Sequence, residues 1–211
     1  MPMIKAKILA MTKAYVRKSM EGDSSHDFLH IERVVRNARE IAKKEKADPF
    51  IVEMASLLHD IDDWKFSKGK DRAKEHLESA TLDKKTIAKI MTAINEVSFK
   101  GAKVDTTPSS IEGKIVQDAD RLDALGAIGI ARCFSYGGYK GHAIYDPLIK
   151  PRLHSSFSQY KKARTTSINH FHEKLLLLKD RMNTKTGKRL AKRRHAFMLK
   201  FLKEFSKETG F

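Results

Sequence analysis

The apolar residues of this chain recur at the spacing of amphipathic helices. Between residues 31 and 42 most lie three or four positions apart, at Ile31, Val34, Val35, Ala38, Ile41 and Ala42. An α-helix completes a turn every 3.6 residues, so these side chains share one face and form a buried stripe. Similar stripes occur elsewhere, whereas no segment shows the strict alternation of a half-buried strand. The pattern predicts an all-α fold, a helical bundle.

Capping residues and glycines place the boundaries of these helices. Asp48 followed by Pro49 is typical of a helix start. We expect further helices at about 4–16, 71–80 and 84–97, one helix running from Ile111 to Ala131, another at about 173–178, and a last one after a break at 184–187. Glycines and prolines between residues 135 and 160 predict a long loop, of the kind that often forms a lid or binds substrate.

The length and composition favour one soluble domain. At 211 residues, 41% of them hydrophobic, the chain can bury a core as a single domain, 1–211. It has no apolar run of about 18 residues and no signal-peptide pattern at its start, so we expect a cytoplasmic protein without a membrane partner. The lone Cys133 excludes an internal disulfide and a thiolate zinc cluster. Any metal must therefore be held by histidines and carboxylates.

The formal net charge of +16 is concentrated near the end of the chain. Residues 150–211 hold 17 Lys or Arg against 4 Asp or Glu, which accounts for +13 of it. We interpret the excess first as solvated helix faces, then as attraction of an anionic substrate, and last as nucleic-acid binding. A helical nucleic-acid-binding protein with structural His and Asp residues remains the alternative from another class. It predicts strongly salt-dependent binding by residues 188–194, but that segment lacks a base-reading motif.

Three segments carry side chains that suit a metal. An apolar helical run ends in His59 and Asp60, a His-rich segment at 25–30 ends in His30, and a cluster of carboxylates occupies 117–123. Successive helical residues turn by about 100°, so Asp118 and Asp120 point in nearly opposite directions, and periodicity does not choose between them. Two imidazoles with carboxylates suit Mn²⁺, Fe, Co²⁺, Ni²⁺ or Zn²⁺ better than Mg²⁺. Such an ion can polarise a phosphoryl oxygen and lower the pKa of a bound water.

The three segments together resemble the HD-domain metal-dependent phosphohydrolase superfamily. Residues 30–34 look like its first His motif, 57–60 its central His-Asp motif and 119–122 its terminal Asp motif, in the same order. These motifs cover about 25–130, the expected metal-site core, and leave a loop and basic helices at about 135–211. The segments 25–30, 118–127 and 165–178 are similar to small stand-alone bacterial HD hydrolases, some of which are nucleotide pyrophosphohydrolases. The resemblance implies an HD-domain helical bundle with additional C-terminal helices.

Carried over residue by residue, the resemblance implies a set of metal ligands and catalytic groups. The implied ligands are His30, His59, Asp60 and Asp120. Asp63 lies where related enzymes place an acidic residue that handles a proton. His26 could orient water or hydrogen-bond a phosphate, although a role as a helix cap is favoured over both. We expect a divalent ion, Mn²⁺ first, with Fe, Co²⁺, Ni²⁺, Zn²⁺ or Mg²⁺ as alternatives.

Five further residues are candidates for binding substrate. Arg33 and Arg121 could bind phosphate or form salt bridges that orient aspartates. Asp123 could accept a hydrogen bond from a ribose or a base, and it could equally orient Arg121 or another side chain. Lys65 lies in a basic segment that could hold phosphate oxygens. His170 could supply another polar group, although a surface position suits it equally.

These observations predict a metal-dependent phosphohydrolase that acts on a small phosphorylated compound. We expect a nucleoside triphosphate to be cleaved to its monophosphate and pyrophosphate. The alternatives within this class are a phosphomonoesterase, such as a 5′-nucleotidase, and a hydrolase of a signalling nucleotide. The sequence leaves open whether the chain forms a homodimer.

Overall fold

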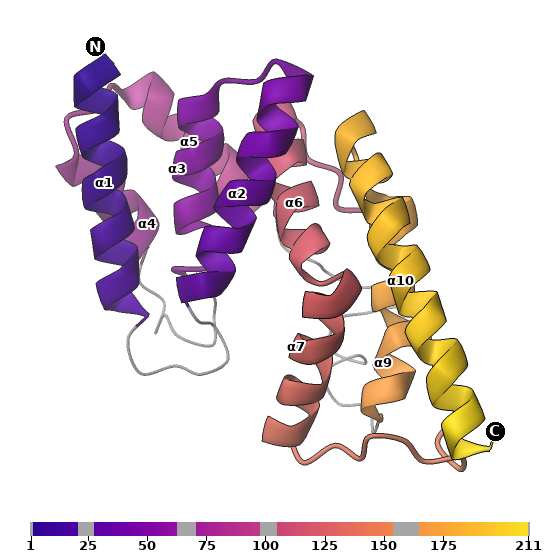
Figure 1. Cartoon of the computed structure of the whole chain (residues 1–211). Coiled ribbons are helices and arrows are strands. Elements are labelled where there is room, and N and C mark those ends of the chain that lie inside the picture. Colours follow the sequence, from indigo (N-terminus) through magenta and orange to yellow (C-terminus); the bar gives the residue numbers. More distant parts are fainter. Residues whose placement is uncertain (1, 21–27, 63–70, 98–104, 154–164, 211) are drawn as a thin grey trace. The chain divides into compact units, whose positions relative to one another are not determined.

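All the regular secondary structure in the described residues is helical. The computed structural model describes residues 2–20, 28–62, 71–97, 105–153 and 165–210, and these contain no strand (Figure 1). The all-α fold predicted from the periodicity is confirmed. The elements are α1 Pro2–Ser19, α2 Phe28–Glu45, α3 Pro49–Leu58, α4 Arg72–Ser79, α5 Lys84–Asn95, α6 Ile111–Asp123, α7 Gly126–Tyr139, α9 Ser167–Glu173, the 3-10 helix η1 Leu175–Arg181 and α10 Lys185–Thr209. Within the described ranges, no helix is both long and apolar enough to cross a membrane.

The chain divides into two compact units. Unit 1 comprises residues 1–98 and 107–119, and unit 2 comprises residues 99–106 and 120–211. The division falls inside α6, between Ala119 and Asp120. That all 211 residues act as one domain stays a prediction.

In unit 1, α3 is the central helix. It packs against α1, α2 and α5, and Figure 1 shows it between α1 and α2. Eight of its ten residues are buried, which fits a helix covered on several sides. Its start is capped as predicted, because the Asp48 carboxylate accepts hydrogen bonds from the amides of Phe50 and Ile51.

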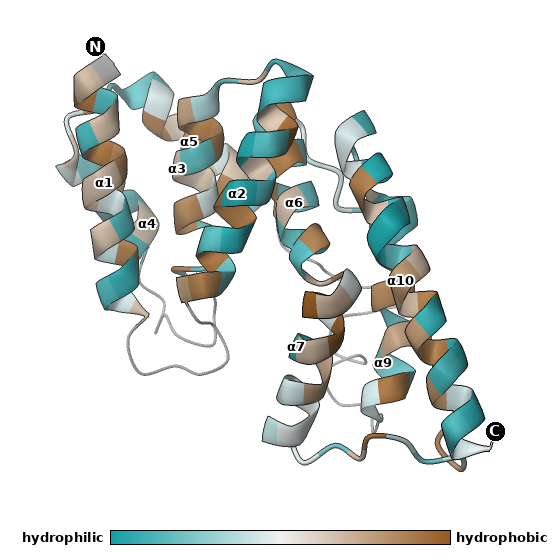
Figure 2. Ribbon diagram, viewed as in Figure 1, coloured by the Kyte–Doolittle hydropathy of each residue, from teal (hydrophilic) through white to brown (hydrophobic). Residues whose placement is uncertain are grey.

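The helix that carries the first histidine motif is amphipathic. All six apolar residues of the predicted stripe on α2 are buried. Teal and brown alternate along α2 in Figure 2, as the period of 3.6 residues requires. The stripe packs α2 against α3, so the residues at the ends of both helices are held at fixed positions.

In unit 2, α7, α9 and α10 pack side by side, and aromatic rings join them (Figure 1). The ring of Phe171 on α9 is fully buried, 6.0 Å from that of Phe134 on α7 and 5.8 Å from that of Phe201 on α10. Offset and tilted aromatic pairs at such distances add to the area that they bury. The buried Phe171 ring thus joins α9 to both of its neighbours.

Three predicted boundaries near unit 2 are wrong. The single helix expected from Ile111 to Ala131 is two helices, because Gly126 adopts φ +75° and the backbone cannot continue an α-helix through a left-handed residue. The helix expected at 173–178 is the end of α9 followed by η1. The expected break at 184–187 is the first turn of α10, where the Thr184 hydroxyl accepts from the Gly187 amide.

The loop expected from residue 135 begins later, because α7 continues to Tyr139. Within α7, a Cβ atom at Gly137 would come within 2.1 Å of the Ser167 hydroxyl oxygen. Glycine at this position therefore allows α7 and α9 to pack closely.

Candidate metal centre

His59 and Asp60 lie in the turn that ends α3. His59 is the C-cap of the helix, and the Ile61 amide donates to the Leu58 carbonyl at 3.1 Å. The Ile61 side chain is buried and anchors the turn against the core of unit 1. The carboxyl end of a helix carries a partial negative charge that favours a nearby cation.

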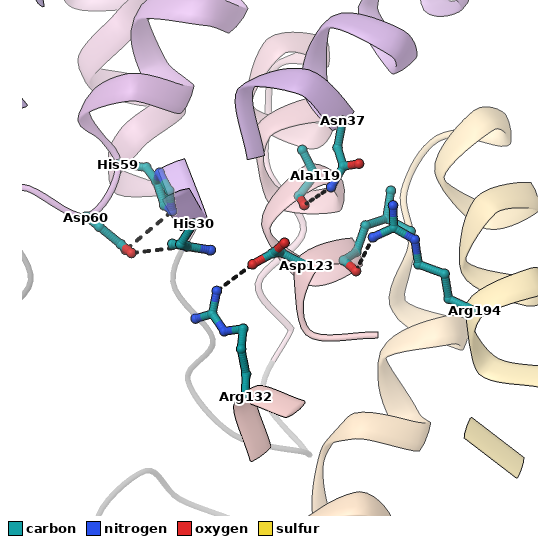
Figure 3. Close-up of polar contacts among 9 residues, drawn as sticks. His30, Asn37, His59, Asp60, Ala119, Asp123, Arg132 and Arg194 are labelled. Atoms are coloured by element: carbon teal, nitrogen blue, oxygen red, sulfur yellow. Dashed lines mark hydrogen bonds and ion pairs between the residues drawn. The ribbon is translucent and has the colours of Figure 1, made fainter. Parts of the chain in front are cut away.

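His30 comes from α2 and meets this turn. It is the third residue of the helix, and its imidazole ring packs edge-on against that of His59, with centroids 5.5 Å apart. His30 Nε2 is 3.4 Å from one carboxylate oxygen of Asp60, and His59 Nε2 is 3.4 Å from the other (Figure 3). One ligand atom from each residue lies within 4.8 Å of the others. The structure thus brings together three of the four predicted metal ligands.

The hydrogen bond on the other side of the His59 ring supports a metal. Nδ1 lies 2.9 Å from the Ser56 carbonyl oxygen, which can only accept, so Nδ1 carries the hydrogen. In the neutral ring, the Nε2 lone pair then faces an oxygen of Asp60. The spacing of 3.4 Å exceeds that of an ordinary N–H···O hydrogen bond. It matches two ligands of one ion with bonds of about 2.1 Å. The cluster fits a divalent cation.

The cluster is nearly closed to solvent on its histidine side. The side chains of His30 and His59 are 4% and 1% exposed, whereas that of Asp60 is 20% exposed. The carboxylate therefore forms the accessible edge of the cluster. A buried His pair is costly if it becomes charged, and coordination of neutral imidazoles avoids that cost.

Asp62 ties the motif to the start of α4, a contact that the sequence analysis did not find. Its two carboxylate oxygens accept from the amides of Arg72 and Ala73, each at 2.9 Å. The N-cap residue Asp71 makes no side-chain capping bond, so Asp62 caps the helix from ten residues away. Sequence spacing gives no signal for this, because helix caps are normally sought next to the helix.

A second buried contact joins α2 to α6 within unit 1. The Asn37 side-chain amide donates to the Ala119 carbonyl at 3.3 Å (Figure 3). Asn37 follows His30 on α2 by seven residues, or about two turns, so both lie on one side of the helix. The bond fixes α6 against α2 immediately before Asp120.

The two aspartates that periodicity left open differ in environment. Asp118 is fully buried in unit 1, and Asp120 is half-buried in unit 2. Asp120 as the fourth ligand stays a prediction from the family resemblance. Arg33 is half-buried on α2, and its role in binding substrate also stays a prediction. His26, Asp63 and Lys65 lie outside the described residues.

Arg121 and Asp123 are buried in unit 2. The Arg121 guanidinium donates to the Arg181 carbonyl and, at 3.1 Å, to the Thr106 hydroxyl. Asp123 forms an ion pair with Arg132 (Figure 3). These bonds account for the burial of both charges without a substrate. The substrate-binding roles expected from the sequence stay predictions.

The carboxyl end of α6 is also fixed. Arg194 on α10 donates to the Leu122 carbonyl (Figure 3). A Cβ atom on Gly126 would lie 3.2 Å from the Arg194 side chain. The arginine thus stabilises the turn between α6 and α7.

His170 lies on α9 and is largely enclosed. Burial is the largest cause of a lowered pKa, and the nearby Lys174 and His142 add to it, so that the pKa of His170 is about 3. The imidazole is therefore neutral near pH 7.

Comparison with known proteins identifies the segment that carries the cluster. Residues 28–125 match the HD domain family. The chain is 39% identical to the Bacillus subtilis protein YpgQ over 93% of this chain and 91% of YpgQ. It is similar to the structure of an HD-superfamily hydrolase from Bacillus thuringiensis, with a TM-score of 0.78, 41% identity and 98% coverage of each chain. A structure of YpgQ in complex with ADP has a TM-score of 0.79, with 36% identity over 97% of this chain and 96% of YpgQ.

Proposed function

The chain belongs to the HD superfamily of hydrolases, and from that premise we propose that it cleaves nucleoside triphosphates to monophosphate and pyrophosphate with the help of a divalent metal ion. The observation that carries the proposal is the cluster of His30, His59 and Asp60 at the meeting of α2 and α3. The complex of the relative YpgQ with ADP supports a nucleotide as the ligand.

We assign the metal to residues of the three HD motifs. His30 and His59 would hold it through Nε2, Asp60 through a carboxylate oxygen, and Asp120 would complete the set. The ion would polarise a phosphoryl oxygen and lower the pKa of a water molecule. Mn²⁺ suits this mixture of nitrogen and oxygen donors, and Fe, Co²⁺, Ni²⁺, Zn²⁺ and Mg²⁺ are the alternatives to be compared with it.

The residues around the metal would orient the ligands and move the proton. The Ser56 carbonyl holds the His59 ring in the tautomer that presents Nε2. Asp63 or His26 would accept the proton of the attacking water and deliver it to the leaving group. Arg33, Lys65 and His170 would bind the phosphates, and their positive charge or N–H groups would offset the charge that develops on phosphoryl oxygens.

The test is product analysis across a nucleotide panel with Mn²⁺ present. Phosphate and pyrophosphate are assayed separately. We expect equal amounts of monophosphate and pyrophosphate. Orthophosphate alone would instead support a phosphomonoesterase, and no release from any nucleotide would contradict a nucleotide substrate. The Asp60→Ala variant should lose turnover while keeping its helical circular dichroism spectrum. Asp83→Ala, which removes an exposed carboxylate that caps α5, is the matched control and should keep turnover.

A further inference from the structure

Helix α10 carries a long run of positive charge. Between residues 185 and 203 it holds eight Lys or Arg and no Asp or Glu. We define the cationic stripe as six exposed side chains of this run: Lys185, Lys188, Lys192, Arg193, Lys200 and Lys203. Steps of three, four or seven residues keep side chains on one side of a helix. A helix rises 1.5 Å per residue, so the stripe extends over about 27 Å.

The other side of α10 is buried in unit 2. Ala191 and Met198 are fully buried, and the Phe201 ring stacks on that of Phe171 on α9. The helix also packs against α7 and η1. Figure 2 shows brown and teal segments alternating along α10, as a helix with one apolar side requires. The side of α10 that is left for a partner is therefore the charged one.

The elements that pack against α10 do not neutralise the stripe. Among the described residues, none of its six side chains forms an ion pair. Helix α7 contains no Asp or Glu, and the one carboxylate of η1, Asp180, pairs with Lys179. The first acidic residue of α10 is Glu204, and it pairs with Lys207 at 2.8 Å. A row of cations without carboxylate partners creates a positive potential that attracts polyanions.

An aromatic ring is exposed at the edge of the stripe. Phe197 is 51% exposed, and it lies four residues after Arg193 and three before Lys200. Residues three and four apart are neighbours on a helix surface, so the ring lies beside both cations. Proteins that bind single-stranded nucleic acids combine cations with aromatic rings, because the face of any base can stack on a ring.

We propose that the cationic stripe of α10 binds the phosphate backbone of a single-stranded nucleic acid, with Phe197 stacked on a base. A stripe about 27 Å long suits an extended polyanion better than one nucleotide. A membrane surface suits it less, because a helix that lies in lipid inserts its apolar side, and that side of α10 is buried. Contacts to phosphates carry no sequence information, so the binding is independent of sequence. This activity lies beside the proposed hydrolysis and does not rest on it.

The test is the binding of a fluorescent oligothymidylate of about 20 nucleotides to the full-length protein, measured by anisotropy at several salt concentrations without added metal. The stripe variant carries Lys188→Gln, Lys192→Gln and Arg193→Gln together. Each phosphate contact to a single strand contributes about 0.7 to the slope of log K against log salt. We therefore expect the slope to fall by about 2 and the affinity to fall at least about tenfold. Phe197→Ala should weaken binding about fivefold or more.

A matched control removes the same charge from another helix. Lys84, Lys85 and Lys89 are exposed on α5 in unit 1, and all three are replaced by Gln. Every substituted side chain is exposed, so the variants should fold, and circular dichroism checks this. The α5 variant should bind the oligonucleotide nearly as the wild type does. The proposal is refuted if the stripe variant binds as tightly as the wild type, or if the α5 variant is weakened equally.

Two further measurements distinguish other partners for the stripe. With a nucleoside triphosphate and Mn²⁺, the stripe variant should keep the KM of the wild type. A raised KM with unchanged oligonucleotide binding would mean that the stripe attracts substrate, and it would overturn the proposal. Loss of binding to phosphatidylserine vesicles with unchanged oligonucleotide binding would assign the stripe to a membrane instead. If no nucleotide is hydrolysed, the proposed function fails, whereas oligonucleotide binding that depends on the stripe still supports this inference.

Discussion

Replacing Asp62 tests whether the turn that carries the metal motif is held from α4. The carboxylate accepts two amide hydrogen bonds at the start of that helix, each of 2.9 Å. Substitution of a capping aspartate by alanine costs about 0.5–2 kcal/mol, and two charge-assisted bonds place Asp62 near the upper end. For Asp62→Ala we expect a loss of about 2 kcal/mol in the free energy of unfolding. This corresponds to a fall of roughly 4–8 °C in the melting temperature.

The same substitution should also weaken metal binding. Asp60 lies two residues before Asp62, so loss of the anchor frees the turn that presents the carboxylate to His30 and His59. Residues that orient metal ligands typically affect metal affinity by about 10–100-fold. Asp62→Asn keeps one acceptor oxygen, and we expect it to lose about half as much stability as Asp62→Ala.

Asp83 provides the control, because it caps α5 by accepting from the Thr86 amide and hydroxyl in the same unit. Thermal unfolding and titration with Mn²⁺ are measured for Asp62→Ala and Asp83→Ala. We expect both variants to lose stability, and only Asp62→Ala to lose metal affinity. Equal metal affinities in the two variants would show that Asp62 caps α4 without orienting the motif.

Three further predictions concern unit 2. Gly137→Ala should lower the free energy of unfolding by about 1–3 kcal/mol, because its Cβ atom meets Ser167. Gly138 has open space around it, so Gly138→Ala should be neutral or slightly stabilising, and denaturant titration compares the two variants. Burial raises the pKa of the Cys133 thiol to about 12, so a thiol reagent at pH 8 should label it only after unfolding. The pKa of His170 is about 3 in the folded chain against an ordinary 6.5, so at intermediate pH the unfolded chain binds a proton that the folded chain does not. The free energy of unfolding should therefore fall as the pH is lowered from 6.5 to 3, and less steeply in His170→Gln. Denaturant titration at several pH values measures this.

Local periodicity predicted the helices best where burial depends only on spacing. The stripe on α2 was predicted in full, and so was the cap at Asp48, because both depend on neighbours within a turn or two. The order of the motifs also led to the three clustered ligands, since helices presenting His30 and His59 need only pack together for them to meet.

The features missed by the sequence analysis depend on contacts between distant segments. Gly126 and Gly137 look alike in the sequence, yet one breaks a helix with a positive φ and the other lets two helices approach. Arg121 was expected to bind phosphate or to orient an aspartate, and its bonds to the Arg181 carbonyl and the Thr106 hydroxyl were not predicted, because a guanidinium can donate to all these kinds of acceptor. The bonds of Asp62 to α4 depend on the path of the intervening chain. No local pattern distinguishes these cases.

The most direct test of the central claim is to titrate the purified protein with Mn²⁺ and to measure the binding by isothermal titration calorimetry. The claim is that His30, His59 and Asp60 hold a divalent ion. We expect a stoichiometric site in the wild type, its loss in His59→Ala and Asp60→Ala, and its retention in Asp83→Ala. Binding by Asp60→Ala with the affinity of the wild type would contradict the assignment of the metal to this cluster.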